Sequence, residues 1–312
     1  MTRDLHPRKG EHHLGAVVAL AVLLMAGCSS DPTPTASDLQ PWEPDSSSSS
    51  PPAEVKQQLP LQQYYLMGRD RETVMRAHTV LTQKCMDEQG FTVRIPPPVP
   101  ETGPGVDLAY RRYGLDSLEV AKKYGYRLPA DPPAVVEARR ANDEYDSNLT
   151  EAEREAIAGA PAEDGSRHRN GCLGKADLQL MEGTKSVPIA GLVAARFVRE
   201  VNVNPRATDS AATKSAMKEF AACMAESGYP SVKDPRDVPI GVATDVTPSA
   251  AEIAAAVTQI GCIESSGVAK AMRTAEIAFQ QRAIEANPEA FAEVKRDLDA
   301  IVRHATQVLA DG

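Results

Sequence analysis

A seven-residue pattern, Cys-Met-x-Glu-x-Gly-aromatic, occurs twice in this chain, at residues 85–91 and 223–229. Glycine favours the left-handed backbone conformation in which many helices end, and an aromatic residue just beyond it can fold back on the last turn. Each copy is followed later in the chain by a Gly-Cys pair, at residues 171–172 and 261–262. We therefore expect two helical units, each closed by a disulfide between the end of one helix and a later segment.

The N-terminus has the features of an export signal. Three basic residues, Arg3, Arg8 and Lys9, precede an apolar run at residues 14–25. That run is shorter than the roughly 20 residues that a membrane-spanning helix needs, and it is typical of the apolar part of a signal peptide. The sequence predicts that residues 1–27 are removed during export.

The end of the apolar run, Leu-Met-Ala-Gly-Cys at residues 24–28, resembles the bacterial lipobox, although Met25 stands where leucine is usual. The resemblance implies that Cys28 receives a diacylglyceryl group and becomes the first residue of the mature protein. Two acyl chains hold a protein firmly on a bilayer, so we expect a lipid anchor on the outer face of the cell membrane. The alternative is an ordinary secretory signal with a chance cysteine.

Four cysteines follow the lipobox, and an even number in an exported chain indicates two disulfides. Four cysteines can pair in three ways, and the repeated pattern favours one disulfide within each unit: Cys85–Cys172 and Cys223–Cys262. The alternative is metal binding, but the chain has no Cys-x-x-Cys, and His168 is a lone candidate ligand near one of the cysteines. We expect neither a metal nor a cofactor.

Composition favours a helical core. Aromatic residues make up 4% of the chain against 42% hydrophobic residues, so the core must consist mainly of Ala, Val, Leu, Ile and Met. We predict a mainly α fold with two disulfide-closed helical units, loop-rich insertions and a long C-terminal helical hairpin or kinked helix. The predicted parts are a signal peptide (1–27), the lipidated cysteine with a disordered Ser/Pro tether (28–58), a first helical unit (59–182) and a second unit with the long C-terminal helices (183–312).

Capping signals and apolar spacing place the helices. Asp116, Thr150 and Ser249 each precede a glutamate by three residues, which predicts a helix start at each position. Ser186 followed by Pro188 predicts another start. Further helices are predicted over 70–89, from 132, from 172, before 224 and from 268.

The C-terminal region has a short heptad-type seam. Its apolar residues alternate at steps of three and four and include Phe291, Val294, Leu298 and Ile301. Asn287 followed by Pro288 favours a fresh helix start, which predicts either a kink or a hairpin there. The seam can form a homo-oligomer contact or pack against the chain's own helices, and its short length favours the second interpretation.

A cluster of tyrosine and arginine residues is the candidate ligand-binding site, because such side chains can hold an anionic ligand. The cluster comprises Tyr110, Arg111, Arg112, Tyr113, Tyr124 and Tyr126. The alternative is that these residues pack over a loop-rich region, and we favour that alternative.

Catalytic patterns are missing from the sequence. The histidines outside the signal peptide, His78, His168 and His304, are scattered, and there is no Gly-x-Ser-x-Gly elbow, His-Glu-x-x-His or phosphate-binding loop. The carboxylates are numerous and are typical of solvated helix faces. The net charge of −9 repels phosphate backbones, which argues against nucleic-acid binding. We therefore expect a protein that is not an enzyme.

The repeated motif, the later Gly-Cys pairs and a Gln/Glu-rich helical tail around residues 276–285 resemble a group of uncharacterised secreted and lipid-anchored actinomycete proteins. The resemblance implies a Gram-positive cell surface and no particular activity. We expect a membrane-anchored interaction or structural module whose partner is a cell-envelope protein or wall polymer. The alternative is a ligand-binding or sensor lipoprotein that uses the tyrosine and arginine cluster.

Overall fold

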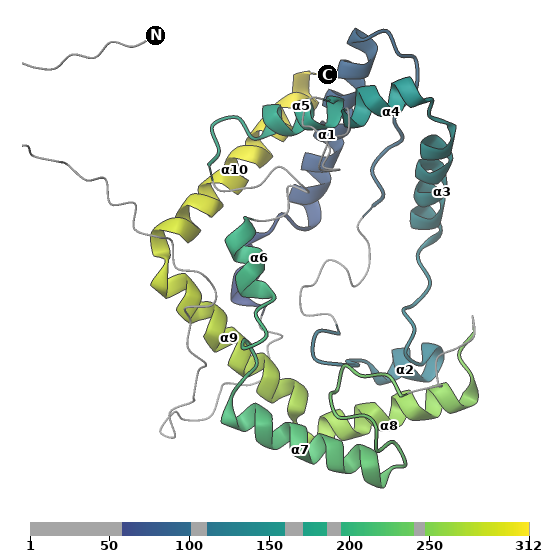
Figure 1. Ribbon diagram of the computed structural model, residues 1–312, viewed down its shortest axis with the longest axis vertical. Helices are drawn as coiled ribbons and strands as arrows, with labels where there is room; N and C mark the ends of the chain where they lie inside the picture. The colour runs from purple at the N-terminus through teal and green to yellow at the C-terminus, as the bar shows by residue number, and fades with distance from the viewer. Residues whose placement is uncertain (1–57, 101–110, 160–170, 186–194, 240–246, 312) are drawn as a thin grey trace, which may run out of the picture. The chain divides into compact units, whose positions relative to one another are not determined.

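The computed structural model describes residues 58–100, 111–159, 171–185, 195–239 and 247–311 (Figure 1). The predicted lipidation site Cys28, the tether, Tyr110 and His168 lie outside these ranges. The described residues form helices and no strands, which confirms the mainly α fold, and none of these helices is long and apolar enough to cross a membrane. The elements are the 3-10 helix η2 (Pro60–Tyr64) and the α-helices α1 (Gly68–Glu88), α2 (Leu118–Tyr124), α3 (Pro133–Asn148), α4 (Glu151–Ala158), α5 (Cys172–Leu180), α6 (Arg196–Asn202), α7 (Ala211–Glu226), α8 (Ala250–Ser266), α9 (Val268–Ala286) and α10 (Pro288–Asp311).

Two helix starts in the first half of the chain test the helix-capping signals in the sequence. Thr150 and Glu153 form the predicted capping box at the start of α4. The start of α2 was predicted one residue too early, because Ser117 rather than Asp116 caps it. The Ser117 hydroxyl accepts a hydrogen bond from the backbone N–H of Val120, which satisfies one of the unpaired donors of the first turn.

Two starts in the second half differ from the predicted pattern. Ser249 caps α8 by accepting a hydrogen bond from the Glu252 backbone, but the Glu252 side chain does not complete a capping box, because it turns into the core and is fully buried. The backbone of Ala195 is extended, with ψ of 148°, so α6 begins only at Arg196. The start predicted at residues 186–188 lies outside the described part of the chain.

Both copies of the repeated motif end their helices in the same way. Gly90 and Gly228 have φ of 86° and 93°, the left-handed values that glycine adopts without strain. The N–H of Phe91 donates to Met86 O across the last turn, and the N–H of Tyr229 donates to Met224 O in the same way. These bonds, together with those from the glycine N–H groups three residues back, form a Schellman motif at each helix end. The local structure predicted from the motif is therefore confirmed.

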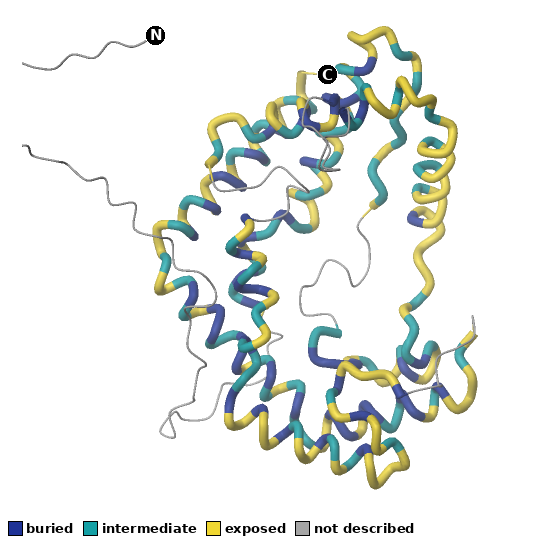
Figure 2. Tube along the Cα trace, in the orientation of Figure 1, coloured by how far each residue is buried: buried dark blue, intermediate teal, exposed yellow. Residues whose placement is uncertain are grey.

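The described residues pack into three clusters of buried apolar side chains. The first joins η2, α1, α5, α6, the end of α9 and α10. The second joins residues 113–121 to α7, α8 and the start of α9. The third is small, with Met86, Ile157 and Cys172 buried and several half-buried side chains around them. Figure 2 shows buried residues recurring along α9 and α10, as expected for helices with one face in a core.

The predicted division between residues 182 and 183 does not correspond to a division in the packing. All described residues belong to one compact unit. The largest helix contact is between α1 and α10, which lie on opposite sides of that division, and the second cluster also combines residues from both sides. The physical reason is that α1 and α10 each carry one apolar face and bury it against the other.

The C-terminal seam is part of this core. Phe291, Val294, Leu298 and Ile301 are each at most 5% exposed. The Phe291 ring lies 4.7 Å from the Tyr64 ring, which belongs to η2. In the described structure these four residues pack within the chain's own core, which is the interpretation that the short seam favoured.

The break between α9 and α10 is a single residue, Asn287, which has φ of −136° and ψ of 49°. The helix resumes at Pro288, as its capping chemistry predicts. Each helix packs mainly on other elements, α9 on α7 and α10 on α1, rather than on its neighbour. The arrangement therefore corresponds to the kinked helix and not to the hairpin.

Candidate functional site

Apart from Tyr110, which lies outside the described residues, the predicted tyrosine and arginine cluster lies in residues 111–127, which we call the Tyr/Arg segment. It contains α2 and packs against α8. Arg111 has φ of 49°, which is uncommon for a residue with a side chain. Its guanidinium donates hydrogen bonds to the backbone carbonyls of Tyr126 and Arg127, at 2.6 and 2.9 Å. Arg111 therefore ties the two ends of the segment together.

Arg112 and Tyr113 bind a buried carboxylate, that of Glu276 in α9, which is 1% exposed. The guanidinium of Arg112 makes a two-pronged contact, Nε to Oε2 at 2.8 Å and Nη2 to Oε1 at 2.5 Å. The Tyr113 hydroxyl donates to Oε2 at 2.9 Å, and Gln280 Nε2 donates to Oε1 at 2.8 Å. Both carboxylate oxygens therefore have two donors each, which offsets the cost of burying the charge.

The electrostatics of this group follow from burial and from the Glu276 charge. Burial and then the negative charge of Glu276 raise the pKa of Tyr113 well above its ordinary value. Burial acts to lower the pKa of Arg112, but its hydrogen bonds to Glu276 and the charge of that carboxylate outweigh burial and raise the pKa. The raised pKa values keep Arg112 protonated and Tyr113 neutral at neutral pH.

A second buried carboxylate, that of Glu252 in α8, is held by the other end of the segment. The backbone N–H of Tyr126 donates to its Oε1 at 3.2 Å, and Arg127 Nη2 donates to its Oε2 at 3.0 Å. Gly125 lies directly against it, since a Cβ at that position would be 2.7 Å from Glu252 Oε1. The Tyr126 hydroxyl donates to Gln259 Oε1 at 2.6 Å, and burial raises the pKa of this tyrosine.

These contacts show where the predicted ligand-binding residues are used. Arg111, Arg112, Tyr113 and Tyr126 bond to the chain's own carbonyls and carboxylates or to a buried amide. Tyr124 is half-buried on α2, with Lys123 Nζ 5.0 Å from the centre of its ring. The structure thus brings the residues together as an internal network that joins the segment to α8 and α9, which is the packing interpretation that we favoured.

The acidic and amide partners of this network were missed in the sequence, where carboxylates were assigned to solvated helix faces. A signal for them exists, because Glu276 and Gln280 follow Met272 at steps of four, on the apolar face of α9. Glu252 and Gln259 stand in the same way on the buried face of α8. A charged residue inside an apolar stripe indicates a buried charge that needs a partner.

The described residues also contain a cleft of about 640 Å³ between the end of α3, α4 and the start of α5. Its walls include the apolar side chains of Leu149, Ile157 and Leu173. Three carboxylates and one guanidinium line the cleft as well, from Asp146, Glu151, Glu155 and Arg154. None of the Tyr/Arg segment lines this cleft.

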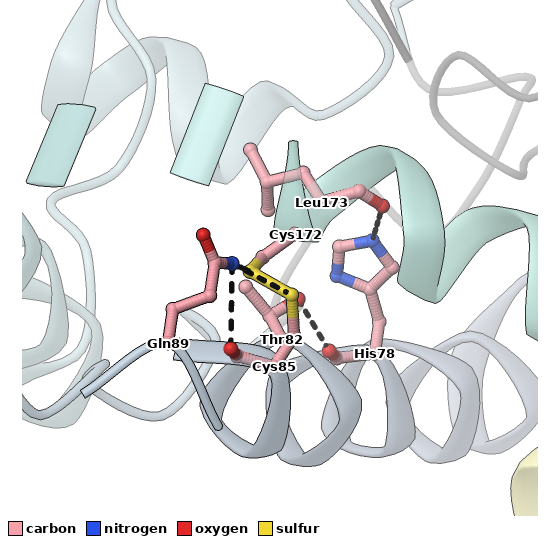
Figure 3. The surroundings of a disulfide bond; sticks show 6 residues. All are labelled: His78, Thr82, Cys85, Gln89, Cys172 and Leu173. Atoms are coloured by element: carbon pink, nitrogen blue, oxygen red, sulfur yellow. Dashed lines mark hydrogen bonds between the residues drawn. A yellow bond between two sulfur atoms is a disulfide. The ribbon is translucent and has the colours of Figure 1, made fainter. Parts of the chain in front are cut away.

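The disulfides are those predicted from the motif, Cys85–Cys172 and Cys223–Cys262, with Cα atoms 5.6 and 5.7 Å apart. Figure 3 shows the first, which joins the end of α1 to the start of α5. About two turns before Cys85 in α1, His78 Nε2 lies 3.3 Å from Leu173 O and 3.1 Å from an Asp177 oxygen, so this histidine also bridges the two helices.

The two histidines that the structure describes therefore have packing roles. His304 Nδ1 lies 3.0 Å from Leu180 O, between α10 and α5. Among the described residues, no group of three or more histidine, cysteine or acidic side chains is placed to hold a metal ion.

Comparisons with protein-family models, with curated proteins and with solved structures find no match to this chain.

Proposed function

We propose that this protein is a lipid-anchored, non-enzymatic module on the outer face of the cell membrane, where it contacts another component of the envelope. The observation that carries this proposal is the pair of disulfides, because such bonds persist in oxidising compartments outside the cytoplasm. The lipobox pattern ending at Cys28 supports the anchor, and the likeness to actinomycete surface proteins supports a Gram-positive envelope.

The internal use of the Tyr/Arg segment supports contact through the outer surface rather than through a ligand site in that segment. Its two arginine–carboxylate pairs are neutral as pairs, and Glu252 and Glu276 are each 1% exposed or less. An anionic ligand would have to displace a buried carboxylate from its arginine, which would leave that charge unpaired. The partner that fits the proposal is an envelope protein or a wall polymer.

The anchor is tested by expressing the full chain and its Cys28→Ser variant in a Gram-positive host. We expect the wild-type chain to fractionate with the membrane, to carry the mass of a diacylglyceryl group, and to be digested when intact protoplasts are treated with protease. We expect the variant to lose the lipid mass. A wild-type chain without lipid, or one that protease cannot reach in intact protoplasts, would overturn the location.

The non-enzymatic contact is tested with the full chain in detergent. We expect it to sediment with purified cell walls, or to crosslink to an envelope protein in intact cells, and to release no soluble fragments from the wall. Arg140→Ala is a suitable surface control, because Arg140 pairs only with its helix neighbours Glu137 and Glu144 in the described structure. Release of wall fragments would show that the protein is an enzyme.

The cleft beside α4 favours a second candidate function, that of a ligand-binding lipoprotein. Apolar side chains with three carboxylates against one guanidinium suit an amphiphilic cationic ligand. A short Lys/Leu peptide should raise the melting temperature of the full chain, and Glu151→Gln with Glu155→Gln should reduce that shift. Glu137→Gln, on the exposed part of α3, is the matched control. A shift that is unchanged in the double variant would exclude the cleft.

A further inference from the structure

Each disulfide joins a partly exposed cysteine near the end of one helix to a buried cysteine of another. Cys85 and Cys223 are the partly exposed members, and Cys172 and Cys262 are at most 2% exposed. An external thiol therefore reaches Cys85 or Cys223, and the buried sulfur is the one that leaves. The two leaving sulfurs lie in different surroundings, which makes the two disulfides chemically unequal.

Cys172 is well placed to leave as a thiolate. It is the first residue of α5, where the partial positive charge of a helix N-terminus stabilises an anion. The side-chain amide of Gln89 donates to Cys172 Sγ at 2.9 Å and lies farther from Cys85 Sγ, at 3.3 Å (Figure 3). Cys85 lies in the last turn of α1, where a helix disfavours negative charge. Both helices therefore direct the electron pair of the broken bond to Cys172.

Cys262 is poorly placed to leave. It lies near the C-terminal end of α8, where the helix dipole opposes negative charge, and it is buried among the apolar side chains of the second cluster. The nearby Ser265 hydroxyl is 4.0 Å from Cys223 Sγ, and it donates to the Cys262 carbonyl instead. A thiolate on Cys262 would be desolvated without the amide donor that Cys172 has.

A recess gives access to the first disulfide. It has a volume of about 240 Å³ and is lined by Cys85 and Gln89, together with two exposed lysines, Lys84 and Lys175, against one exposed carboxylate, Glu88. Lysine side chains attract an incoming thiolate. Access, charge and leaving group therefore all favour attack on Cys85.

We propose that the Cys85–Cys172 disulfide is a site of thiol–disulfide exchange with an extracytoplasmic dithiol reductant. One thiolate of the reductant attacks Cys85 Sγ and forms a mixed disulfide, while the bond to Cys172 breaks and Cys172 leaves as a thiolate. The second thiolate of the reductant then attacks the reductant sulfur of the mixed disulfide, and Cys85 leaves as a thiolate. The reductant loses two electrons and becomes a disulfide, and the two cysteines take up two protons.

The exchange changes the smallest of the three clusters. Cys172 is one of its three buried members, beside Met86 and Ile157, and α4 contributes the last of these. Leu173, the residue after Cys172, lines the 640 Å³ cleft. Reduction thus frees α4 and one wall of the cleft and leaves the second cluster closed by its own disulfide. This site goes beyond the proposed envelope contact and does not depend on it.

The test uses the full chain with both disulfides formed, in detergent, treated with dithiothreitol for increasing times and then alkylated. Peptide mass spectrometry gives the rate at which each cysteine becomes modified. We expect Cys85 and Cys172 to be modified about tenfold faster than Cys223 and Cys262, from the difference in helix position and hydrogen bonding. Equal rates, or faster reduction of the second pair, would overturn the proposal.

Three further measurements test separately the direction of attack, the role of Gln89 and the local release of α4. Brief treatment with glutathione should place the mixed disulfide on Cys85, and glutathione on Cys172 would contradict the assigned direction of attack. Gln89→Ala should slow reduction of the first pair about threefold and leave the second pair, an internal control, unchanged. An unaltered rate for the first pair would rule out the role of Gln89.

After selective reduction, amide hydrogen exchange should rise in α4 and stay slow in α7 and α8. An equal loss of protection from exchange in all three helices would contradict the local release of α4.

Discussion

The two regions closed by the repeated motif share one local structure and differ in almost everything around it. In both, a helix ends at a left-handed glycine and a neighbouring cysteine forms a disulfide. Beside the first disulfide, the described residues form a small cluster with three buried side chains, and α1 and α5 belong to the large first cluster as well. The second disulfide lies in a broad core from α7, α8 and α9. The motif therefore determines how a helix ends, and the tertiary packing determines how strongly that end is held.

The second region also has the buried ion pairs. Arg112 and Arg127 bring the Tyr/Arg segment onto α9 and α8. In the first region, the disulfide and the His78 bridge join α1 to α5, two helices that also pack together in the first cluster. We infer that the first disulfide mainly supports the small third cluster and α4, because α1 and α5 are also held by the first cluster, while the second disulfide reinforces a region that is already well packed.

The largest expected effect comes from removing each disulfide. The loops closed are 87 residues for Cys85–Cys172 and 39 residues for Cys223–Cys262. Loop-closure entropy predicts losses of unfolding free energy of about 4 to 5 kcal/mol for the first pair changed to alanine and about 4 kcal/mol for the second. Urea denaturation of the full chain measures both.

Hydrogen exchange distinguishes the two regions more sharply than total stability does. Without the first disulfide, we expect α4 and the start of α5 to lose protection under native conditions, because their cluster is small. Without the second, α7 and α8 should stay protected, because their core remains. Loss of protection in α7 and α8 of the second variant would show that packing does not hold that region.

Breaking a buried ion pair tests the second region directly. Arg112→Ala leaves Glu276 buried without its guanidinium, and we expect it to reduce the free energy of unfolding by about 3 to 5 kcal/mol. Arg140→Ala removes an exposed arginine from α3 and should change the free energy of unfolding far less, because exposed ion pairs are screened by solvent. Calorimetry of the two variants compares them, and equal losses would mean that the Glu276 network does not stabilise the second region.

Much of the fold could be predicted from local sequence. The disulfide pairing, the two glycine helix ends, the capping box at Thr150 and the break at Asn287 all depend on residues a few positions apart or on repetition of the motif. The start of α2 was misplaced by one residue, because Asp116 and Ser117 are both good caps and the sequence does not decide between them.

The buried network could not be predicted, because its contacts join distant parts of the chain. Arg112 and Glu276 are 164 residues apart, and Arg127 and Glu252 are 125 apart. One sequence shows that each residue is charged but not which distant charge it meets. For the same reason, the apolar seam of α10 predicts a packing surface without naming α1 as its partner.

Tyrosine ionisation gives the next comparison between the regions. Burial, then the charges of Asp146 and Glu153, raise the pKa of Tyr145 beside the third cluster to about 12, and burial with Glu276 raises that of Tyr113 in the second cluster further. An unfolded tyrosine ionises near pH 10, so a folded state that keeps the proton is fully stabilised below about pH 10 and loses stability as the pH rises.

The expected loss for Tyr113 is about 1.4 kcal/mol for each pH unit above about 10. Tyr145 should ionise in the folded protein at about pH 12, where its contribution ends. Tyr113→Phe should therefore flatten the alkaline decline in stability more than Tyr145→Phe does, as followed by tyrosinate absorbance and circular dichroism. An equal effect would mean that the two tyrosines have similar surroundings, contrary to the contacts of Tyr113 with Glu276.

The smallest expected effect, the cost of replacing the left-handed glycine at a helix end, should be the same in both regions. Gly90 and Gly228 have left-handed φ values, and a Cβ at either would meet no atom within 4 Å. Alanine at each position should therefore cost about 1 kcal/mol of unfolding free energy, from backbone strain alone. Gly261→Ala is the matched control, because that exposed glycine lies inside α8 without a left-handed φ and should gain about 0.5 to 1 kcal/mol. If the losses of unfolding free energy for Gly90→Ala and Gly228→Ala differ from each other by more than about 1 kcal/mol, the two helix ends are not equivalent. The difference between the regions would then begin within the motif itself.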